Sequence, residues 1–184
     1  MVATADLAAP AGGVGRSRAD RRERRDRQQL CAGSSRGGRR KRGAKAQAIG
    51  TSRGGRTTKL HLITDLLGRP IVLHLTPGNV ADIKAAPALL AAAGRFKRLI
   101  GDRGYDADAL RRALHDCGAQ PVIPGRRSRT RPIRHDERRY RERWRIEAAV
   151  CRLKDFRRVA TRYDKLAANF LSAVALAAIY AFWL

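Results

Sequence analysis

The sequence has few of the residues that would indicate a disulfide-stabilised domain or a structural zinc site. Its 184 residues include three cysteines, Cys31, Cys117 and Cys151, none in a CxxC pair, and four histidines without metal-ligand spacing to them. This favours a reduced, cytosolic setting and argues against zinc. We interpret Cys117 and Cys151 as small residues that are buried or half-buried. The start of the chain also lacks the positive region and apolar core of a secretory signal.

Acidic residues are scarce relative to basic ones. Sixteen Asp and Glu stand against 40 Lys and Arg, which leaves a formal net charge of +24. Such an excess favours a polyanionic partner, because each neutralised phosphate releases a condensed counterion. Charge alone leaves open a ribosomal protein, a DNA-binding protein and an enzyme that acts on nucleic acid.

The first third of the chain has almost no β-branched or aromatic residues. Residues 1–59 hold 16 basic and 4 acidic side chains, which is half of the net charge, among many glycines and alanines. We therefore expect residues 1–42 to form a basic, disordered tail. We expect no strand in residues 1–56.

From Thr57 onward the hydrophobic pattern predicts a globular α/β domain. Residues 57–64 alternate at period two, Gly68 marks a turn, and residues 70–75 form a second strand. Helix, strand, helix, strand and two further helices follow, an order typical of α/β folds. Residues 166–184 are almost wholly apolar, interrupted by Asn169 and Ser172. We expect a buried helix that closes the domain, with a membrane anchor as the alternative.

One predicted helix carries an unusual stripe of polar residues. Residues 137–159 contain no Gly or Pro, and four polar side chains fall within an arc of about 60° at 100° per residue: Tyr140, Arg143, Glu147 and Lys154. A carboxylate flanked by a phenol, a guanidinium and an ammonium suits a metal ligand among phosphate-holding groups. An ordinary i,i+4 ion pair between Arg143 and Glu147 is the alternative.

A second carboxylate follows a predicted buried strand. Asp102 comes directly after residues 96–101, and α/β folds place their sites at such strand ends. The alternative is a helix-capping role, for which Asp106 fits better. One carboxylate at a strand end and another on a later helix form a minimal Mg²⁺ ligand set. Two such ions clamp the attacking and leaving oxygens in phosphoryl transfer.

Three segments together carry a resemblance to a known family. They read GTSRGGRTTKLHLITDLLGRPIVLHLTPGNVADIKAAPALL, DRGYDADALRRAL and YRERWRIEAAVCRLKDFRRVATRYDKLAANFL. The sequence closely resembles the DDE transposases of bacterial insertion sequences, nearest to the insertion-sequence-five type within the insertion-sequence-four superfamily. The resemblance runs from about residue 43 to the C-terminus, and the Tyr-Arg-Glu-Lys spacing matches the family signature without a gap.

The resemblance implies a fold, a reaction and partners. It implies a ribonuclease H-like core in which two Asp and one Glu bind two Mg²⁺ ions, with Mn²⁺ able to substitute. These ions cut DNA at transposon ends and join the freed 3′ hydroxyl to target DNA. By position, Asp102 resembles the second Asp and Glu147 the Glu. The implied partners are double-stranded DNA at transposon ends and target, and a second copy of the chain. The implied location is the bacterial cytoplasm, at the nucleoid.

Several basic residues become candidates for DNA contact under this resemblance. Tyr140, Arg143 and Lys154 are expected to contact transposon-end DNA or to support the site. The loop arginines Arg126, Arg127 and Arg129 precede the helix and are expected to contact phosphates. The outer helix face carries Arg138, Arg141, Arg145 and Arg152, either as a solvated stripe or as a DNA track. We expect Trp144 to be a packing residue rather than a base-stacking one, and His61 and His74 to be half-buried polar residues.

The sequence departs from the family where the first Asp should lie. The family places it on an apolar strand upstream of GTSRGG, whereas this chain has RRERRDRQQLCAGSS there. We assign no catalytic role to Asp6, Asp20, Glu23 or Asp26, so no first catalytic Asp is found. We therefore expect residues 43–184 to form an incomplete catalytic domain without its central strand. The tail then resembles either translation from another reading frame or the start of a truncated open reading frame, and we expect an upstream-frame product as a further partner.

These departures lead to alternative functions. One is a transposase by descent that folds poorly and has negligible strand-transfer activity alone. Another is a non-catalytic basic remnant that occupies transposon ends. A general basic protein of ribosomal type is the third, and the helix signature argues against it.

Overall fold

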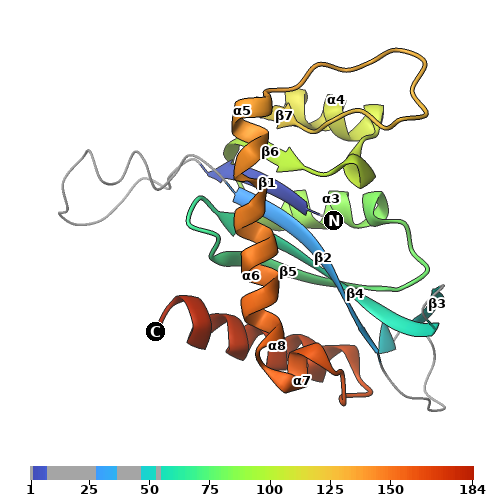
Figure 1. Ribbon diagram of the computed structural model, residues 1–184, viewed down its shortest axis with the longest axis vertical. Coiled ribbons are helices and arrows are strands. Elements are labelled where there is room, and N and C mark those ends of the chain that lie inside the picture. Colours follow the sequence, from blue (N-terminus) through green and yellow to red (C-terminus); the bar gives the residue numbers. More distant parts are fainter. Residues whose placement is uncertain (1, 8–27, 37–46, 53–54) are drawn as a thin grey trace.

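The fold is a mixed α/β arrangement in which helices cover both faces of one sheet (Figure 1). The computed structural model describes residues 2–7, 28–36, 47–52 and 55–184. Seven strands make the sheet in this part of the chain. They are β1 (Val2–Leu7), β2 (Gln28–Arg36), β3 (Gly50–Ser52), β4 (Gly55–Asp65), β5 (Pro70–Pro77), β6 (Phe96–Gly101) and β7 (Gln120–Val122).

The centre of the sheet contains strands from the first third of the chain. β2 pairs antiparallel with β4 from Leu30 to Arg36 and parallel with β6 at its beginning, and β6 pairs parallel with β7. β1 also lies between β4 and β6. The expectation that residues 1–56 contain no strand, and that the core lacks its central strand, is therefore wrong. The division at residue 42 stays a prediction, because residues 8–27 and 37–46 lie outside the described residues.

The predicted hairpin is confirmed. β4 and β5 pair antiparallel, with His61 opposite His74. The turn closes through hydrogen bonds from the amide of Gly68 to the carbonyl oxygen of Asp65 and from the amide of Asp65 to that of Arg69, both 3.0 Å. Gly68 has φ +82°, a left-handed conformation that glycine adopts without strain.

Period-two alternation places successive residues of β4 on opposite faces of the sheet. On one face, Ile63 packs with Leu89 of α3 (Ala86–Ala93) and Leu114 of α4 (Asp108–Asp116). On the other face, Leu62 packs with residues of α6 (Trp144–Lys154) and α8 (Ala167–Phe182). The core therefore has two layers, one on each face of the sheet: α3 and α4 cover one face, and α6 and α8 cover the other.

Short helical turns connect these elements. They are η1 (Asp82–Ala85), η2 (Arg103–Tyr105), α5 (Glu137–Tyr140), η3 (Arg141–Arg143) and α7 (Arg157–Ala160). Gly118, at φ +71°, follows α4 as the sequence predicts for a helix end.

The terminal helix α8 is buried along only part of its circumference. Phe170 and Val174 face the core, whereas Leu176 and Tyr180 are exposed. The expectation of a buried helix that closes the domain therefore holds only for the face of α8 that carries Phe170 and Val174. Among the described residues, no helix has the length and apolarity needed to cross a membrane.

Candidate functional site

The polar stripe lies on one nearly continuous helical run. α5, η3 and α6 follow each other without a break from Glu137 to Lys154. The structure departs from the predicted helix in a 3₁₀ turn at η3 and in a break at Asp155 and Phe156 before α7. Asp136 caps the run, because its carboxylate accepts a hydrogen bond of 3.0 Å from the amide of Arg139. The buried side chains of Ile146 and Leu153 fix the helix against the sheet. The run crosses in front of β1 and β2 (Figure 1).

Within the stripe, the predicted ion pair forms. Nη2 of Arg143 lies 2.5 Å from Oε1 of Glu147. The guanidinium of Arg143 also lies 5.8 Å from the ring centroid of Tyr140, and that ring meets His135 edge-on at 5.2 Å. Lys154 is exposed at the end of α6. The ion pair is compatible with a site here, because the charge of Arg143 also lowers the pKa of Asp102.

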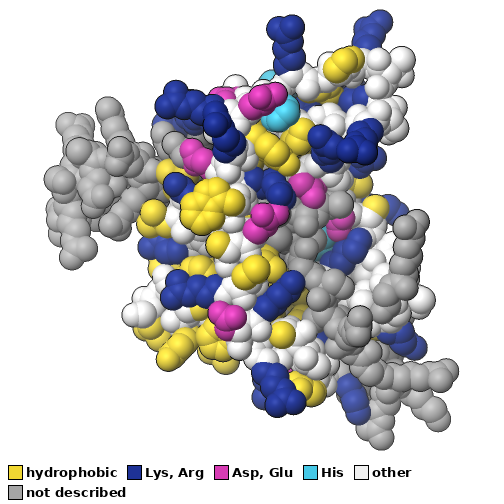
Figure 2. Space-filling model, in the orientation of Figure 1, with side chains coloured by type: hydrophobic (Ala, Val, Ile, Leu, Met, Phe, Trp, Pro, Cys, Tyr) yellow, Lys and Arg dark blue, Asp and Glu magenta, His cyan; other side chains and the backbone are white. Residues whose placement is uncertain are grey.

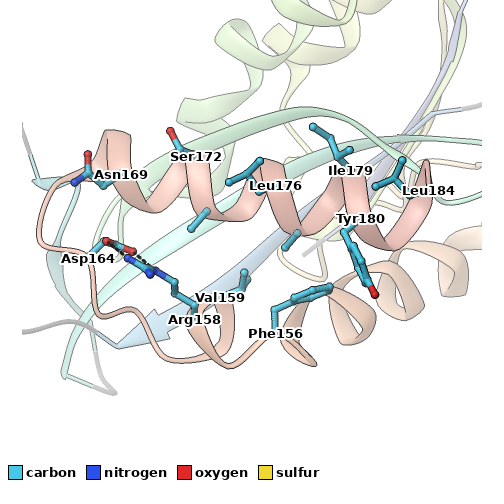
Figure 3. A pocket seen from close by; sticks show the side chains of 12 residues that line it. Phe156, Arg158, Val159, Asp164, Asn169, Ser172, Leu176, Ile179, Tyr180 and Leu184 are labelled. Carbon is cyan, nitrogen blue, oxygen red and sulfur yellow. Dashed lines mark hydrogen bonds and ion pairs between the residues drawn. The ribbon is translucent and has the colours of Figure 1, made fainter.

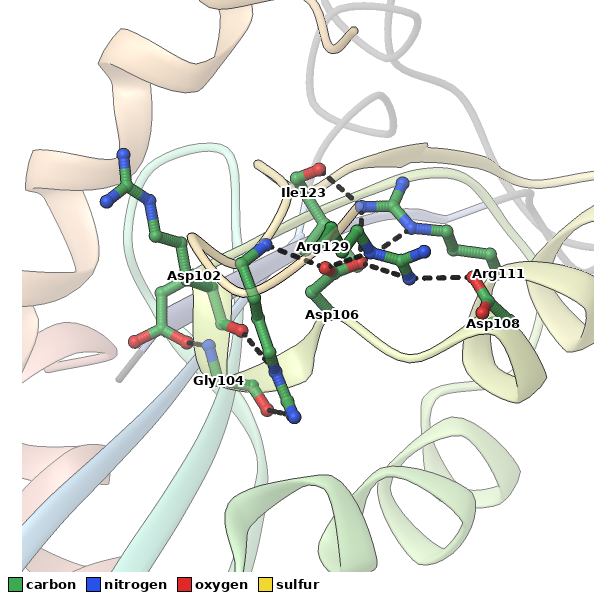
Figure 4. Close-up of polar contacts among 9 residues, drawn as sticks. Asp102, Gly104, Asp106, Asp108, Arg111, Ile123 and Arg129 are labelled. Atoms are coloured by element: carbon green, nitrogen blue, oxygen red, sulfur yellow. Dashed lines mark hydrogen bonds and ion pairs between the residues drawn. The ribbon is translucent and has the colours of Figure 1, made fainter. Parts of the chain in front are cut away.

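Asp102 lies at the end of β6 and shares this neighbourhood. Its Oδ1 accepts a hydrogen bond of 2.7 Å from the amide of Gly104, which caps η2 (Figure 4). Burial raises the pKa of Asp102, the charge of Asp82 raises it further, and Arg143 lowers it. The pKa of Tyr140 is raised by burial and responds in turn to Arg143 and Asp102. Asp102 and the stripe are therefore electrostatically coupled.

The turn that carries Asp102 is tied to the sheet by a buried network. The hydroxyl of Tyr105 lies 3.1 Å from Nδ1 of His61, whose Nε2 lies 2.7 Å from Oγ1 of Thr76. His61 is fully buried, not half-buried as expected, whereas His74 is half-buried. Burial lowers the pKa of His61 to about 4. A neutral imidazole thus links β4 to the residues after β6.

Asp106 is a second anchor of the same turn, rather than the helix cap that the sequence predicts. It does not cap α4, whose N-cap is Ala107. Its buried carboxylate instead contacts Nε of Arg129 at 2.6 Å, Nε of Arg111 at 2.9 Å and the amide of Arg126 at 2.8 Å. Burial alone would raise the pKa of Asp106, but these hydrogen bonds lower it to about 2.

The basic loop after β7 is folded onto this turn (Figure 4). Arg129 holds both Asp106 and Asp108, and Arg126 donates to the carbonyl oxygens of Arg103 and Gly104 at 3.2 and 3.1 Å. Arg127 is exposed. The guanidinium of Arg129 is therefore committed to two carboxylates. Of the three loop arginines, Arg127 is the one whose position suits a phosphate best.

Other residues of the helix run depart from the expectations. Trp144 is 60% exposed, so the packing role is wrong for it. Arg145 donates to the carbonyl oxygen of Leu66 and lies 5.9 Å from the Trp144 ring, and Arg152 lies 5.0 Å from the Phe182 ring. Two of the four outer-face arginines thus have structural contacts. Figure 2 shows Lys and Arg side chains spread over this face, with acidic ones among them.

Two of the cysteine expectations are also wrong. Cys117 and Cys151 are exposed: the first follows the end of α4, and the second lies on α6 one turn after Glu147.

The carboxylates available for a metal are fewer than the resemblance implies. Among the described residues, no three His, Cys, Asp or Glu side chains come together as a metal site. Asp102 and Glu147 remain as two oxygen ligands of the type that Mg²⁺ prefers. Asp102 fits a cation chemically, because its burial raises the free energy of the charged carboxylate, and a cation would offset that cost.

The strand register shows which positions lie beside Asp102. Gln29 of β2 is level with Ile100 of β6, so Cys31 is level with the position of Asp102. β1 places Val2 opposite Cys31. Neither residue is acidic, and Asp6 lies four residues along β1 from that position. Asp26 lies outside the described residues, and β2 begins two residues after it, at Gln28.

Asp82, at the start of η1, is a further buried carboxylate. It is 7% exposed and pairs with Nζ of Lys59 at 3.1 Å. Its charge acts on both Asp102 and His61. Because Asp82 lies far in the sequence from the DRGY segment, no local pattern predicts that its charge acts on Asp102.

Comparison with known proteins gives a consistent result. The family described as "Transposase DDE domain" matches residues 25–182. A putative transposase for insertion sequence element IS6501 from Brucella ovis is 37% identical over 124 residues, which cover 66% of this chain and 94% of the relative. A putative transposase for insertion sequence element IS402 from Burkholderia cepacia is 34% identical over 121 residues, 60% of this chain and 55% of the relative. No solved structure is significantly similar to the chain.

Proposed function

The chain belongs to the DDE transposases of insertion sequences, and we propose that its site performs DNA strand cleavage and transfer at the ends of such an element. The observation that carries the proposal is the position of Asp102 at the end of β6, which α5 contacts, so that Arg143 acts on the pKa of Asp102 and both Asp102 and Glu147 act on that of Tyr140. A half-buried carboxylate beside a basic helix face suits a phosphodiester and its metal.

We further propose that the core is ribonuclease H-like. The supporting observation is the strand order β5, β4, β2, β6, β7, in which β4 is antiparallel to both β5 and β2, and the later strands β6 and β7 run parallel to β2. β1 lies in the same interval of the sheet. This order places Asp102 beside the central strand.

Each residue of the site has a proposed part in the reaction. Asp102 and Glu147 would hold Mg²⁺, which when bound supplies Lewis-acid activation of the scissile phosphate and of the attacking oxygen. Arg143 orients Glu147 through their ion pair and can share its other donors with a DNA phosphate. Tyr140 offers a phenol hydroxyl, and Lys154 and Arg127 offer exposed cations to the DNA backbone.

The exposed ring of Trp144 is a further candidate for DNA contact. It lies immediately after Arg143 and carries the guanidinium of Arg145 near its face. An exposed aromatic flanked by cations suits stacking on an unpaired base.

We propose that the chain alone cleaves weakly. The central strand is present, so poor folding is no longer the reason. The reason is the sheet position beside Asp102, where the register places Cys31 and Val2 rather than an acidic residue. Two carboxylates hold Mg²⁺ less firmly than three.

The test uses duplexes that carry the ends of the encoding element. We expect end-specific binding, slow Mg²⁺-dependent nicking, and loss of nicking with binding retained in Asp102→Asn and Glu147→Gln. Asp116→Asn, which changes an exposed carboxylate of α4, is the matched control and should change neither. Rapid cleavage by the unmodified chain would contradict the weak activity. End-specific binding without any nicking would favour the alternative, a DNA-binding remnant that occupies transposon ends.

A further inference from the structure

A buried ion pair lies beside the site and takes no part in the chemistry proposed above. Asp82, at the start of η1, is buried, and its Oδ1 lies 3.1 Å from Nζ of Lys59 on β4. The same Nζ donates a hydrogen bond of 2.7 Å to the carbonyl oxygen of Val80. Apart from the ion pair, Oδ1 of Asp82 has no hydrogen-bond partner among the described residues. Asp82 therefore carries a charge that solvent screens little.

The loop after β5 holds Asp82 against the sheet. The amide of Gly78 donates a hydrogen bond of 2.9 Å to the carbonyl oxygen of Thr57, and a Cβ at residue 78 would overlap Oγ1 of Thr57. The amide of Val80 donates to the carbonyl oxygen of Pro77 at 3.0 Å. The loop therefore turns tightly against β4, and this turn brings Asp82 back to the strand that it has just left behind.

The ion pair lies next to the turn that carries Asp102. η1 contacts η2, the 3₁₀ turn that Asp102 caps. The charge of Asp82 raises the pKa of Asp102 and also that of His61. Lys59 carries the opposite charge on β4, two residues before His61, and lowers the pKa of that imidazole. Both charges of the pair therefore act on the surroundings of the proposed metal ligand.

Asp82 is not placed as a ligand itself. Its carboxylate is turned to Lys59, and no three His, Cys, Asp or Glu side chains come together in the part of the chain that the structure describes. A carboxylate that does not touch a cation still attracts it, and burial reduces the screening of that attraction. Even at the dielectric constant of water, a unit charge about 10 Å from a divalent ion changes its dissociation constant about fourfold.

We propose that Asp82 and Lys59 set the affinity of the site for its divalent cation without touching the cation. Asp82 strengthens binding by attraction, and Lys59 weakens it by compensating part of that attraction. The inference rests on the proposed function, because it concerns the metal assigned to Asp102 and Glu147. It gives the site a third negative charge, whereas the positions of β1 and β2 level with Asp102 are not acidic.

The test measures Mn²⁺ binding to the full chain, without DNA and without turnover. Free Mn²⁺ gives an electron paramagnetic resonance signal that broadens on binding, so a titration yields the dissociation constant. Salt of about 0.01 M keeps the Debye length at about 30 Å. The relevant binding component is the one that Asp102→Asn removes. We expect Asp82→Asn to raise its dissociation constant about threefold or more, and Lys59→Gln to lower it about twofold or more.

The opposite signs separate this role from a structural one. Both substitutions break the same ion pair, so a pair with a structural role alone would shift the affinity in one direction. Arg158 and Asp164 form a matched control pair, also 3.1 Å apart (Figure 3), and the side chains of Asp82 and Asp164 are 8% and 10% exposed. The control pair lies beside α7, well away from β6 along the long axis (Figure 1). Asp164→Asn and Arg158→Gln should leave the dissociation constant unchanged.

Circular dichroism checks the fold of each variant. If Asp82→Asn does not fold, the double variant Lys59→Gln with Asp82→Asn, which leaves neither charge of the pair buried, is compared with Lys59→Gln and should bind Mn²⁺ more weakly. Shifts of the same sign in the two single variants, or no shift in either, would overturn this inference alone. An unmodified chain without the component that Asp102→Asn removes would contradict the metal site of the proposed function, and this inference with it.

Discussion

Single residues in this protein act mainly by tying the turn after β6 to its surroundings. Asp106 and His61 are both buried, and each links that turn to another part of the chain, the first to the basic loop and the second to β4. Neither residue belongs to the Tyr-Arg-Glu-Lys stripe. The position of Asp102 therefore depends on side chains that take no part in the proposed chemistry.

Asp106→Asn should destabilise the protein strongly. The change leaves the guanidiniums of Arg111 and Arg129 without their buried carboxylate, a loss of about 3–5 kcal/mol for a buried pair. Chemical denaturation measures the change in the free energy of unfolding. Asp108→Asn is the matched control, because Asp108 pairs with the same Arg129 while 69% of its side chain is exposed, and it should cost less than about 1 kcal/mol. Equal effects of both changes would refute the buried network.

His61 should make stability depend on pH. Its pKa is lowered from 6.5 to about 4, mainly by burial. The negative charge of Asp82 raises this pKa, whereas His74 and Lys59 lower it further. Between these values the unfolded chain binds a proton that the folded chain does not. The free energy of unfolding should therefore fall by about 3 kcal/mol as pH drops from 6.5 to 4.

A substitution isolates this contribution. His61→Gln should flatten the pH dependence in that window, as followed by thermal unfolding in a pH series. His115→Gln, at an exposed position of α4, should leave the slope as it is. An unchanged slope in His61→Gln would show that other groups cause it.

Elements differ in how far the sequence predicts them. β4 and β5 alternate at period two and carry Gly68 between them, so the local pattern and the tertiary structure agree. β2 has no such pattern in QQLCAGSSR, and its strand conformation comes from pairing with β4 and β6 on either side. Tertiary context overrides propensity there. Trp144 and Cys151 were misassigned for a related reason, because residue type alone does not say which face of a helix is buried.

The site was predictable to the same extent as its elements. The helical spacing of Tyr140, Arg143 and Glu147 was sufficient to place them together, and the strand end located Asp102. The commitment of Arg129 to Asp106 was not predictable, because residues 106 and 129 meet only through the folding of β7 and its loop.

The helix run that carries Glu147 should be held by its buried face. Leu153 is 1% exposed and packs in the core under α6. Leu153→Ala should lower the free energy of unfolding by about 2–5 kcal/mol, measured by denaturant titration. Cys151→Ala, two residues earlier on the exposed face, should change it by less than about 0.5 kcal/mol. If the two variants were equally stable, α6 would not be packed as described.

β2 offers a direct test of the missing carboxylate. Because the register places Cys31 level with Asp102, Cys31→Asp should increase Mg²⁺-dependent nicking of transposon-end DNA. Increases of one or more powers of ten are in the range that a metal-holding group provides. Cys117→Asp adds the same carboxylate at an exposed position at the end of α4 and should have no effect. No gain from Cys31→Asp would remove the register-based explanation of weak activity.

The whole molecule combines a basic surface with a half-buried carboxylate at the end of β6, Asp102, and an exposed one on α6, Glu147. The net charge of +24 suits a DNA partner of any sequence. What would distinguish the proposed strand-transfer enzyme from a general basic protein is a metal site shared by Asp102 and Glu147, which lie 45 residues apart in the sequence. The central claim is therefore that these two carboxylates hold one metal site.

Iron-directed cleavage of the polypeptide tests this claim most directly, because it needs no catalytic turnover. Fe²⁺ with ascorbate and peroxide would replace Mg²⁺ and generate radicals that cut the backbone near the ligands. We predict cuts near both residue 102 and residue 147, suppressed by Mg²⁺, lost together in Asp102→Asn or Glu147→Gln, and retained in Asp116→Asn. Cuts near only one of the two positions, or cuts at one that persist when the other is changed, would contradict a shared site.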